Sequence, residues 1–320
     1  MQLEKLSSLR TVQVLSRAVS SFLAEELLPH FHWQTANELI LQRVLLTSKR
    51  TKVAAFSEVL PILTCVVVGG EVSTAIPLAA NWWLLLFAAQ LLDDVQDQDA
   101  DWSEVSELSS AQLLSAAVYA LGIAQTSLAK IPVDCTVLSS VLSLVGEMQA
   151  HAAHAQGMEL TQTSKQRSLE MYYRLSVQKS ANLFASICDA GARLGCRDPK
   201  QWESCNQFGM SIGLMKQIQD DVADLHDPLG KSDLMARHDT MPLLKGLGMR
   251  DQAQHAELCA LVQSAERTTD IAQQIKEILT EIGAIQFCLQ VAEGHRAQAI
   301  AALQTFPTHL TTVLRDYAAC

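Results

Sequence analysis

The chain consists of long apolar stretches in which hydrophobic residues recur at helical spacing, with polar residues at the intervening positions. No segment keeps the strict alternation of apolar and polar residues that a half-buried strand requires. Ala and Leu are abundant and only eight residues are proline, a composition that favours helix formation. The pattern therefore predicts an all-α protein.

Breaks in this pattern mark the ends of the expected helices. Residues 11–47 predict one or two amphipathic helices interrupted near Pro29, and the next apolar helix is expected to end at Gly69. After a polar connector, Ser109 or Ser110 offers an N-cap for the helix that follows. The remaining helices are expected over residues 76–92, 135–161, 168–195, 250–282 and 285–303. A further helix contains the apolar stretch 208–218 and presents the second aspartate cluster, and a short final helix carries Arg315.

Length, charge and cysteine content narrow the class of protein. The 320 residues suffice for one large core, and the absence of a visible hinge predicts a single domain over residues 1–320. The net charge of −10, without a clustered basic surface, argues against a nucleic-acid partner. Eight cysteines scattered without CxxC spacing predict reduced thiols, and the N-terminus lacks a signal-peptide pattern, so a cytoplasmic protein is expected.

One apolar stretch, residues 76–92, approaches the composition of a membrane span. It contains Pro77, Asn81 and Gln90, falls short of the ~20 apolar residues that a span requires, and runs directly into aspartates. We therefore expect a buried core helix here and a protein that is not transmembrane.

Two aspartate clusters with the same spacing each follow an apolar helical stretch. The first consists of Asp93, Asp94 and Asp97, and the second of Asp220, Asp221 and Asp224. Carboxylates on one helix face repel each other unless a cation lies over them. Mg²⁺ prefers such oxygen ligands and bridges them to substrate phosphates. A single cluster is equally consistent with a solvated helix end, but the repeated spacing predicts two clusters that face each other and form one metal site.

Several cations are candidates for binding an anion near these clusters. Lys179 stands in an otherwise apolar part of its helix, where an unpaired ammonium is unfavourable, so it is expected to meet an anion. Lys231 lies in a loop rich in Gly and Pro after the second cluster. Lys49 and Arg50 precede an apolar helix; such groups are usually solvated, and they bind the anion only when the fold brings them to the aspartates.

These elements, taken in order from Lys49 to the C-terminus, resemble the trans-isoprenyl diphosphate synthases. The matching elements are the first DDxxD, the Gln156–Leu160 element, Lys179-Ser180, the run from Gly209 to Asp224 that includes Gly213 and Gln217, and Gly230-Lys231 before Thr240-Met241-Pro242. Each motif alone is weak, but five in the family's order are a specific signal.

The resemblance implies a class I isoprenoid synthase-like antiparallel helix bundle with a central apolar cavity. It implies that both aspartate clusters hold about three Mg²⁺ ions on the diphosphate of an allylic substrate, so that its C–O bond breaks to an allylic cation. It also implies a homodimer. The diphosphate-binding residues implied are Lys179, Gln217, Lys231, Lys49 and Arg50.

The sequence departs from this family where chain-elongating members bind isopentenyl diphosphate. Those members carry an Arg-Arg pair shortly after the first cluster, whereas no basic residue stands here between Asp101 and Lys130. The sequence therefore predicts prenyl transfer to an acceptor that it does not identify. Three alternatives stay open: a terpene cyclase on the same scaffold, a ComQ-type enzyme that prenylates a peptide tryptophan, and a non-catalytic subunit that binds prenyl diphosphates.

The helix that ends at the first cluster predicts how deep the prenyl pocket is. Small residues one turn before Asp93 leave room along the helix for an apolar chain of about fifteen to twenty carbons. The residues expected to line this pocket are Ala88, Ala89, Leu85 and Trp82, together with Gln156 and Phe184.

Overall fold

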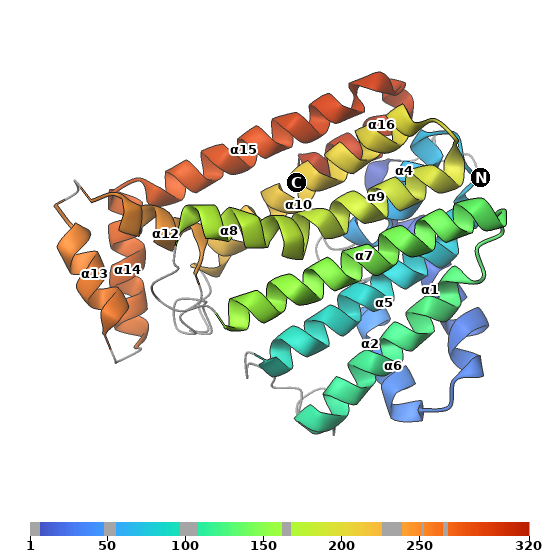
Figure 1. Ribbon diagram of the computed structural model, residues 1–320, viewed down its shortest axis with the longest axis horizontal. Coiled ribbons are helices and arrows are strands. Elements are labelled where there is room, and N and C mark those ends of the chain that lie inside the picture. The colour runs from blue at the N-terminus through green and yellow to red at the C-terminus, as the bar shows by residue number, and fades with distance from the viewer. Residues whose placement is uncertain are drawn as a thin grey trace. The chain divides into compact units, whose positions relative to one another are not determined.

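Every regular element that the structure describes is a helix, which confirms the all-α prediction (Figure 1). The computed structural model describes residues 7–47, 56–96, 108–161, 168–225, 239–250, 253–264 and 268–319.

In chain order the helices are α1 (Ser8–Ser21), η2 (Phe22–Leu27), η3 (Leu28–His30), α2 (Gln34–Thr47), α4 (Leu60–Val67), α5 (Val72–Gln96), α6 (Ser110–Leu128), α7 (Cys135–Leu160), α8 (Leu169–Ser176), η6 (Val177–Ala181), α9 (Asn182–Gly195), α10 (Pro199–Asp224), α12 (Met241–Gly248), α13 (His255–Gln263), α14 (Thr269–Glu281), α15 (Ala284–Ala302), η7 (Leu303–Thr305) and α16 (Thr308–Ala318).

These helices form two compact units. Unit 1 comprises Met1–Glu147, Ser186–Phe208 and Ala302–Cys320, and unit 2 comprises Met148–Ala185 and Gly209–Ala301. The chain passes between the units inside α7, α9, α10 and α15. The expectation of a single domain over residues 1–320 stays a prediction.

The core of unit 1 contains α5 packed against α6. Two buried polar side chains form hydrogen bonds between these helices. The Asn81 amide donates to the Ala124 carbonyl at 2.9 Å, and the Ser127 hydroxyl donates to the Pro77 carbonyl. Because each bond joins a side chain on one helix to the backbone of the other, together they fix how the two helices align.

By length and composition alone, α5 and α6 are apolar enough to cross a membrane. Of the most apolar window, however, 72% is buried inside the protein in α5 and 44% in α6. The high value for α5 agrees with the core helix expected over residues 76–92, because core helices of globular proteins have this composition too.

Local signals placed several helix ends correctly. Gly69 follows α4 with a φ of 95°, a conformation that glycine adopts without strain. Ser109 caps α6 through a capping box with Gln112. The break expected near Pro29 occurs at η3, between the first helices and α2.

Two predicted helices differ from the structure. The single helix expected over residues 250–282 is wrong, since α13 ends at Gln263 and α14 begins after Thr268, whose hydroxyl accepts a hydrogen bond from the Ile271 amide. This cap starts a new helix where the apolar periodicity alone suggested continuity. The helix expected over residues 168–195 is interrupted by the π-helical segment η6, which residue spacing did not reveal.

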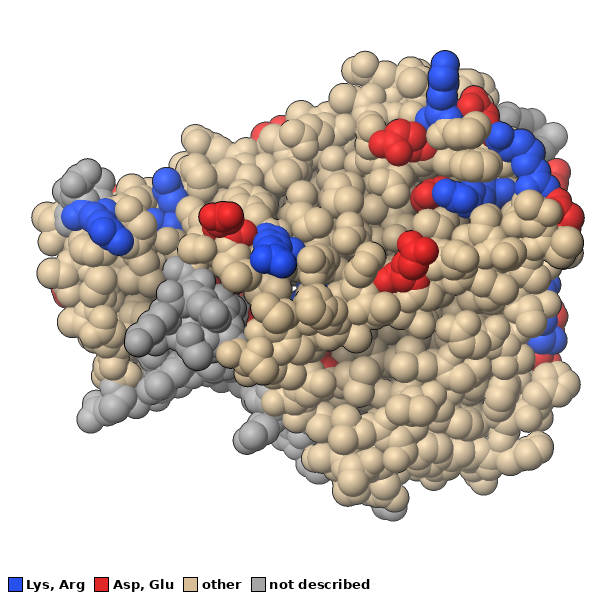
Figure 2. Space-filling view, viewed as in Figure 1, with Lys and Arg blue, Asp and Glu red and all other residues tan. Residues whose placement is uncertain are grey.

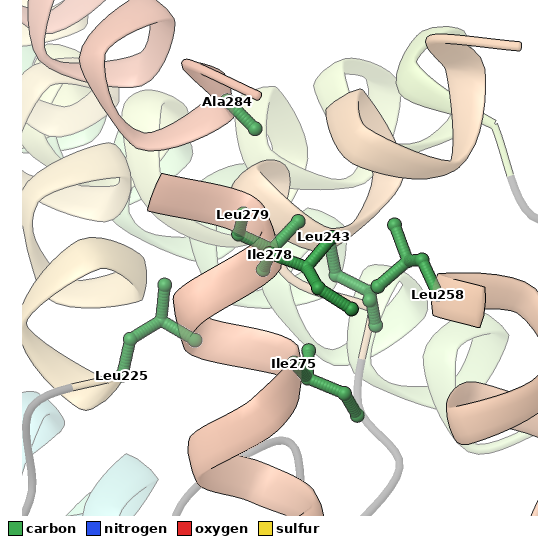
Figure 3. Packing of buried hydrophobic residues seen from close by; sticks show 7 residues of the cluster. All are labelled: Leu225, Leu243, Leu258, Ile275, Ile278, Leu279 and Ala284. Carbon is green, nitrogen blue, oxygen red and sulfur yellow. The ribbon is translucent and has the colours of Figure 1, made fainter. Parts of the chain in front are cut away.

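The core of unit 2 holds the end of α10 in place. Figure 3 shows its buried residues, which come from α12, α13, α14 and α15 and from the position directly after α10: Leu225, Leu243, Leu258, Ile275, Ile278, Leu279 and Ala284. Leu225 follows α10 directly, and Leu243 lies in the first turn of α12. This cluster therefore anchors the C-terminal turn of α10, which carries the second aspartate cluster.

Candidate active site

The first aspartate cluster lies at the C-terminal end of α5 in unit 1. Asp93 and Asp94 occupy its last turn and are half-buried. The third member, Asp97, lies outside the described residues, as do the expected anion-binding residues Lys49 and Arg50. The described part of the cluster thus presents two carboxylates at the end of a buried apolar helix, as the sequence predicted.

The second cluster occupies the last turn of α10 in unit 2, and its members differ in exposure. The Asp220 side chain is 61% exposed and forms an ion pair with Lys216, one turn earlier, at 3.1 Å. Such an exposed pair adds little stability. Asp224 is half-buried, whereas Asp221 is 4% exposed. Adjacent helix positions point about 100° apart, so the two neighbouring aspartates meet different surroundings.

Both carboxylate oxygens of Asp221 accept hydrogen bonds. Gln217 donates its side-chain amide at 2.9 Å, and the backbone amide of Met241 donates at 2.7 Å. Met241 is the first residue of α12, and the preceding Thr240 makes no side-chain capping bond there. Asp221 therefore satisfies an amide that the helix start leaves without an intrahelical partner, and its charge is favourable at the positive end of the helix dipole.

Lys179 forms an ion pair with a carboxylate of unit 2, and its expected contact with a diphosphate stays a prediction. Its ammonium contacts the Glu159 carboxylate of α7 at 2.8 Å, with side chains 35% and 37% exposed. Lys179 lies in the π-helical segment η6, and single π-helical turns frequently occur at functional sites. Glu159 was missed as a site residue, although it belongs to the same element as Gln156.

Two glycines allow α10 to lie directly against the segment that carries Lys179. A Cβ at Gly213 would lie 2.7 Å from the Ala181 Cα, and one at Gly209 would collide with the backbone of Phe184. At this close approach the Ser180 hydroxyl donates to the Gln217 side-chain carbonyl at 2.5 Å. The repeated glycines thus have a physical reason: they bring Lys179-Ser180 and the second cluster together.

Tyr172 of α8 adds a buried phenol beside the second cluster. Its burial, and secondarily the negative charge of Asp221, raise the pKa of Tyr172 above the usual value of a tyrosine. The hydroxyl of this phenol therefore keeps its proton. Residue spacing offers no signal for this tyrosine, because its position near Asp221 depends on the tertiary fold.

The residues expected to line a prenyl pocket differ in accessibility. In unit 1, Trp82 and Ala88 are fully buried, and the Trp82 indole donates to the Ser57 carbonyl at 2.8 Å. Leu85 is 7% exposed, and Ala89 is exposed one turn before Asp93. Ala89 is thus the member of this set with free surface beside the first cluster.

The two expected pocket residues of unit 2 are covered to a large extent. Phe184 is 8% exposed and lies in the first turn of α9, just after the π-helical segment, while Gln156 is half-buried on α7. Lys231, expected nearby, lies outside the described residues. The expectation that these residues share one pocket with α5 stays a prediction.

The carboxylates at the ends of α5 and α10 suit a hard divalent cation. Asp93, Asp94, Asp220 and Asp224 offer charged oxygen ligands of the kind that Mg²⁺ and Ca²⁺ prefer. Within the ranges that the structure describes, no three His, Cys, Asp or Glu side chains are already close enough to hold a metal ion. The expectation that the two clusters face each other stays a prediction.

The sequence model of the polyprenyl synthetase family matches residues 34–281 of the chain. A short chain isoprenyl diphosphate synthase of Methanothermobacter thermautotrophicus is 24% identical over 257 residues, which cover 74% of this chain and 75% of the relative. Octaprenyl diphosphate synthase of Escherichia coli is 26% identical over 263 residues, covering 77% of this chain and 78% of the relative.

Solved structures share the fold over nearly the whole chain. The geranylgeranyl pyrophosphate synthetase of Pyrococcus horikoshii matches with a TM-score of 0.84 at 17% identity, covering 98% of this chain and 97% of its own. The geranylgeranyl pyrophosphate synthase of Corynebacterium glutamicum, complexed with calcium and isoprenyl diphosphate, matches with a TM-score of 0.76 at 19% identity, covering 97% and 94%.

Proposed function

The chain belongs to the polyprenyl synthetase family and is a prenyltransferase, and we propose that it ionises an allylic isoprenyl diphosphate with the help of Mg²⁺ and transfers the prenyl group to an acceptor. The observation that carries this proposal is the arrangement in unit 2, where α10 presents Asp220 and Asp224 while its glycines hold Lys179 close by. The calcium and isoprenyl diphosphate bound to a protein of the same fold support it.

Each group of charged residues has its own role in the proposed site. Asp93, Asp94, Asp220 and Asp224, with Asp97 outside the described residues, would hold about three Mg²⁺ ions. When bound, Mg²⁺ would supply Lewis-acid stabilisation of the leaving diphosphate. Lys179 donates a charge-assisted hydrogen bond to the diphosphate and exchanges its bond to Glu159 for this one. Lys231, Lys49 and Arg50 complete the proposed anion site, and Gln217 supports it through its hydrogen bonds to Asp221 and Ser180.

The donor and the acceptor follow from what surrounds the first cluster. We assign a donor of about fifteen to twenty carbons, because small side chains precede Asp93 on the helix that ends there. The named relatives are synthases of isoprenyl diphosphates, and isopentenyl diphosphate is the acceptor that we propose to test first. One observation favours a second candidate, a terpene cyclase that needs no such acceptor: the sequence has no basic residue between Asp101 and Lys130.

Incubation of the full chain with Mg²⁺ and labelled allylic diphosphates tests this function. Parallel reactions with and without isopentenyl diphosphate separate the candidates by their products. A longer linear diphosphate supports chain elongation, and a hydrocarbon or alcohol formed without isopentenyl diphosphate supports cyclisation or hydrolysis. The donors tested have about ten to twenty carbons, the lengths that the apolar helix before Asp93 could accommodate. If none of them releases diphosphate, the proposal is contradicted.

Ala89→Phe is expected to shorten the prenyl chain that the enzyme accepts or produces by at least about one isoprene unit, because the added ring occupies space beside Asp93. Chromatography of the labelled products, or the ratio of kcat/KM for donors of two lengths, measures this. Ala256→Phe, at an exposed alanine of α13, is the matched control and should leave the length unchanged. An unaltered chain length in Ala89→Phe would remove Ala89 from the pocket.

We also propose a homodimer that uses the outer face of α6. This helix contains no Asp, Glu, Lys or Arg, and it exposes Leu114 by 39% and Val118 by 67%. Figure 2 shows no charged residue on the surface over α6. Large apolar exposure without charge is typical of interfaces. Light scattering that reports a species of twice the chain mass supports the dimer, and a species of the chain mass alone contradicts it.

The cytoplasmic location expected from the sequence is retained as part of the proposal. Fractionation of cells that express the full chain checks it, and recovery in the membrane or exported fraction would contradict it.

A further inference from the structure

The adjacent aspartates Asp220 and Asp221 have different roles, and we propose that Asp221 is a positioning residue that acts through Gln217 on Ser180, beside Lys179. The inference rests on the proposed function, since it assigns a role inside the diphosphate site. It starts from burial: the Asp220 side chain is 61% exposed, whereas Asp221 is 4% exposed and bonded to two donors on different elements.

The chemistry of the three side chains fixes the direction of every hydrogen bond among them. An ionised carboxylate only accepts, so Gln217 must turn its NH₂ group toward Asp221. The Gln217 carbonyl oxygen then faces Ser180, whose hydroxyl must donate, and it does so at 2.5 Å. The buried carboxylate of Asp221 therefore fixes the direction of both hydrogen bonds that link α10 to the π-helical segment η6.

The same carboxylate ties this chain to α12. Its second oxygen accepts the backbone amide of Met241 at 2.7 Å. Asp221 thus joins three elements of unit 2: α10, the segment η6 that carries Lys179 and Ser180, and the start of α12. A residue with this set of bonds holds the position of the diphosphate-binding lysine without touching the diphosphate.

A consequence follows for Ser180. Because its proton is committed to Gln217, its oxygen presents only lone pairs to any ligand. Ser180 then does not donate to the diphosphate, and Lys179 is the donor that this segment supplies. At position 221 the site therefore requires a side chain that fixes the direction of these hydrogen bonds, and it does not require the negative charge of Asp221.

A metal ligand and a positioning residue respond differently to an exchange of the two side chains. In the Gln217→Glu variant two carboxylates face each other in place of the hydrogen bond of 2.9 Å, so the series of hydrogen bonds from Asp221 to Ser180 is interrupted. In the double variant Asp221→Asn, Gln217→Glu the new asparagine donates to the new glutamate and still accepts from the Met241 amide. The Ser180 hydroxyl again donates to position 217, and every polar group has a partner.

The test uses the full chain with Mg²⁺ and inorganic pyrophosphate, whose affinity is measured by calorimetry, alongside hydrogen exchange of the Met241 amide and the melting temperature. Gln217→Glu is expected to weaken pyrophosphate binding by about tenfold or more and to speed exchange of the Met241 amide. The double variant is expected to restore both to within about threefold of the wild type. Asp220→Asn serves as the comparison for loss of a metal ligand.

The proposal is overturned if the double variant binds pyrophosphate as weakly as Asp220→Asn does although its Met241 amide remains protected. Asp221 would then be a metal ligand. Should Gln217→Glu not fold, the double variant is compared with the wild type and Asp221→Ala: wild-type affinity supports the proposal and low affinity overturns it. Turnover of allylic diphosphates by the wild type tests the proposed function separately, because the exchange and binding measurements do not depend on it.

Discussion

Asp93→Asn is expected to lower the release of diphosphate from an allylic donor by about three orders of magnitude, because a neutral amide replaces a charged oxygen ligand of the proposed metal site and the lost Lewis-acid stabilisation amounts to several kcal/mol. Single-turnover release at saturating donor measures it. The variant should fold normally, since Asp93 is half-buried in the last turn of α5 and its loss relieves repulsion with neighbouring aspartates.

Glu26→Gln is the matched control in unit 1, because it removes an exposed carboxylate distant in sequence from either cluster. It should keep wild-type turnover. A raised Mg²⁺ concentration should recover part of the activity of Asp93→Asn, as expected for weakened metal binding. Turnover within about tenfold of the wild type in Asp93→Asn would reject the metal site at the end of α5.

Lys179→Met is expected to lower kcat/KM by about a hundredfold. The variant removes a charge-assisted hydrogen bond to the diphosphate, worth about 1.5–3 kcal/mol, and it leaves the Glu159 carboxylate uncompensated beside an anionic substrate. The steady-state rate with an allylic diphosphate measures it, and calorimetry with pyrophosphate gives the binding part of the loss.

The ion pair with Glu159 provides an internal check on this prediction. Lys179→Met combined with Glu159→Gln should recover part of the lost affinity, because the repulsion between Glu159 and the diphosphate is removed. Lys200→Met, at an exposed lysine of α10, is the matched control and should behave as the wild type. Unchanged kcat/KM in Lys179→Met would take this lysine out of the diphosphate site.

Local sequence signals were sufficient for most of the fold. The bounds of α7, the cap at Ser109 and the stop at Gly69 agree with expectation because each depends on residues within one or two turns. Helix periodicity likewise identified α5 as a core helix. The same local rules failed over residues 250–282, where the Thr268 cap divides the segment although the apolar spacing continues.

Residue spacing also did not predict the π-helical segment η6, for a different reason. Nothing in the residues from Val177 to Ala181 marks an extra residue in the turn, and it arises where Ala181 packs against Gly213 of α10. Contacts between segments thirty residues apart are invisible to periodicity. The consequence is functional, because this segment carries Lys179 and Ser180.

The sequence by itself determined that the protein is helical, that it belongs among enzymes acting on prenyl diphosphates, and which acidic and basic residues are candidates for the site. Spacing, composition and motif order carry that information. Only the tertiary structure decided that Lys179 pairs with Glu159, and that Asp221 is buried against Gln217 and the Met241 amide while Asp220 remains exposed. The physical reason is that burial and hydrogen-bond partners come from other helices, so two neighbouring aspartates that are identical in sequence acquire different chemistry.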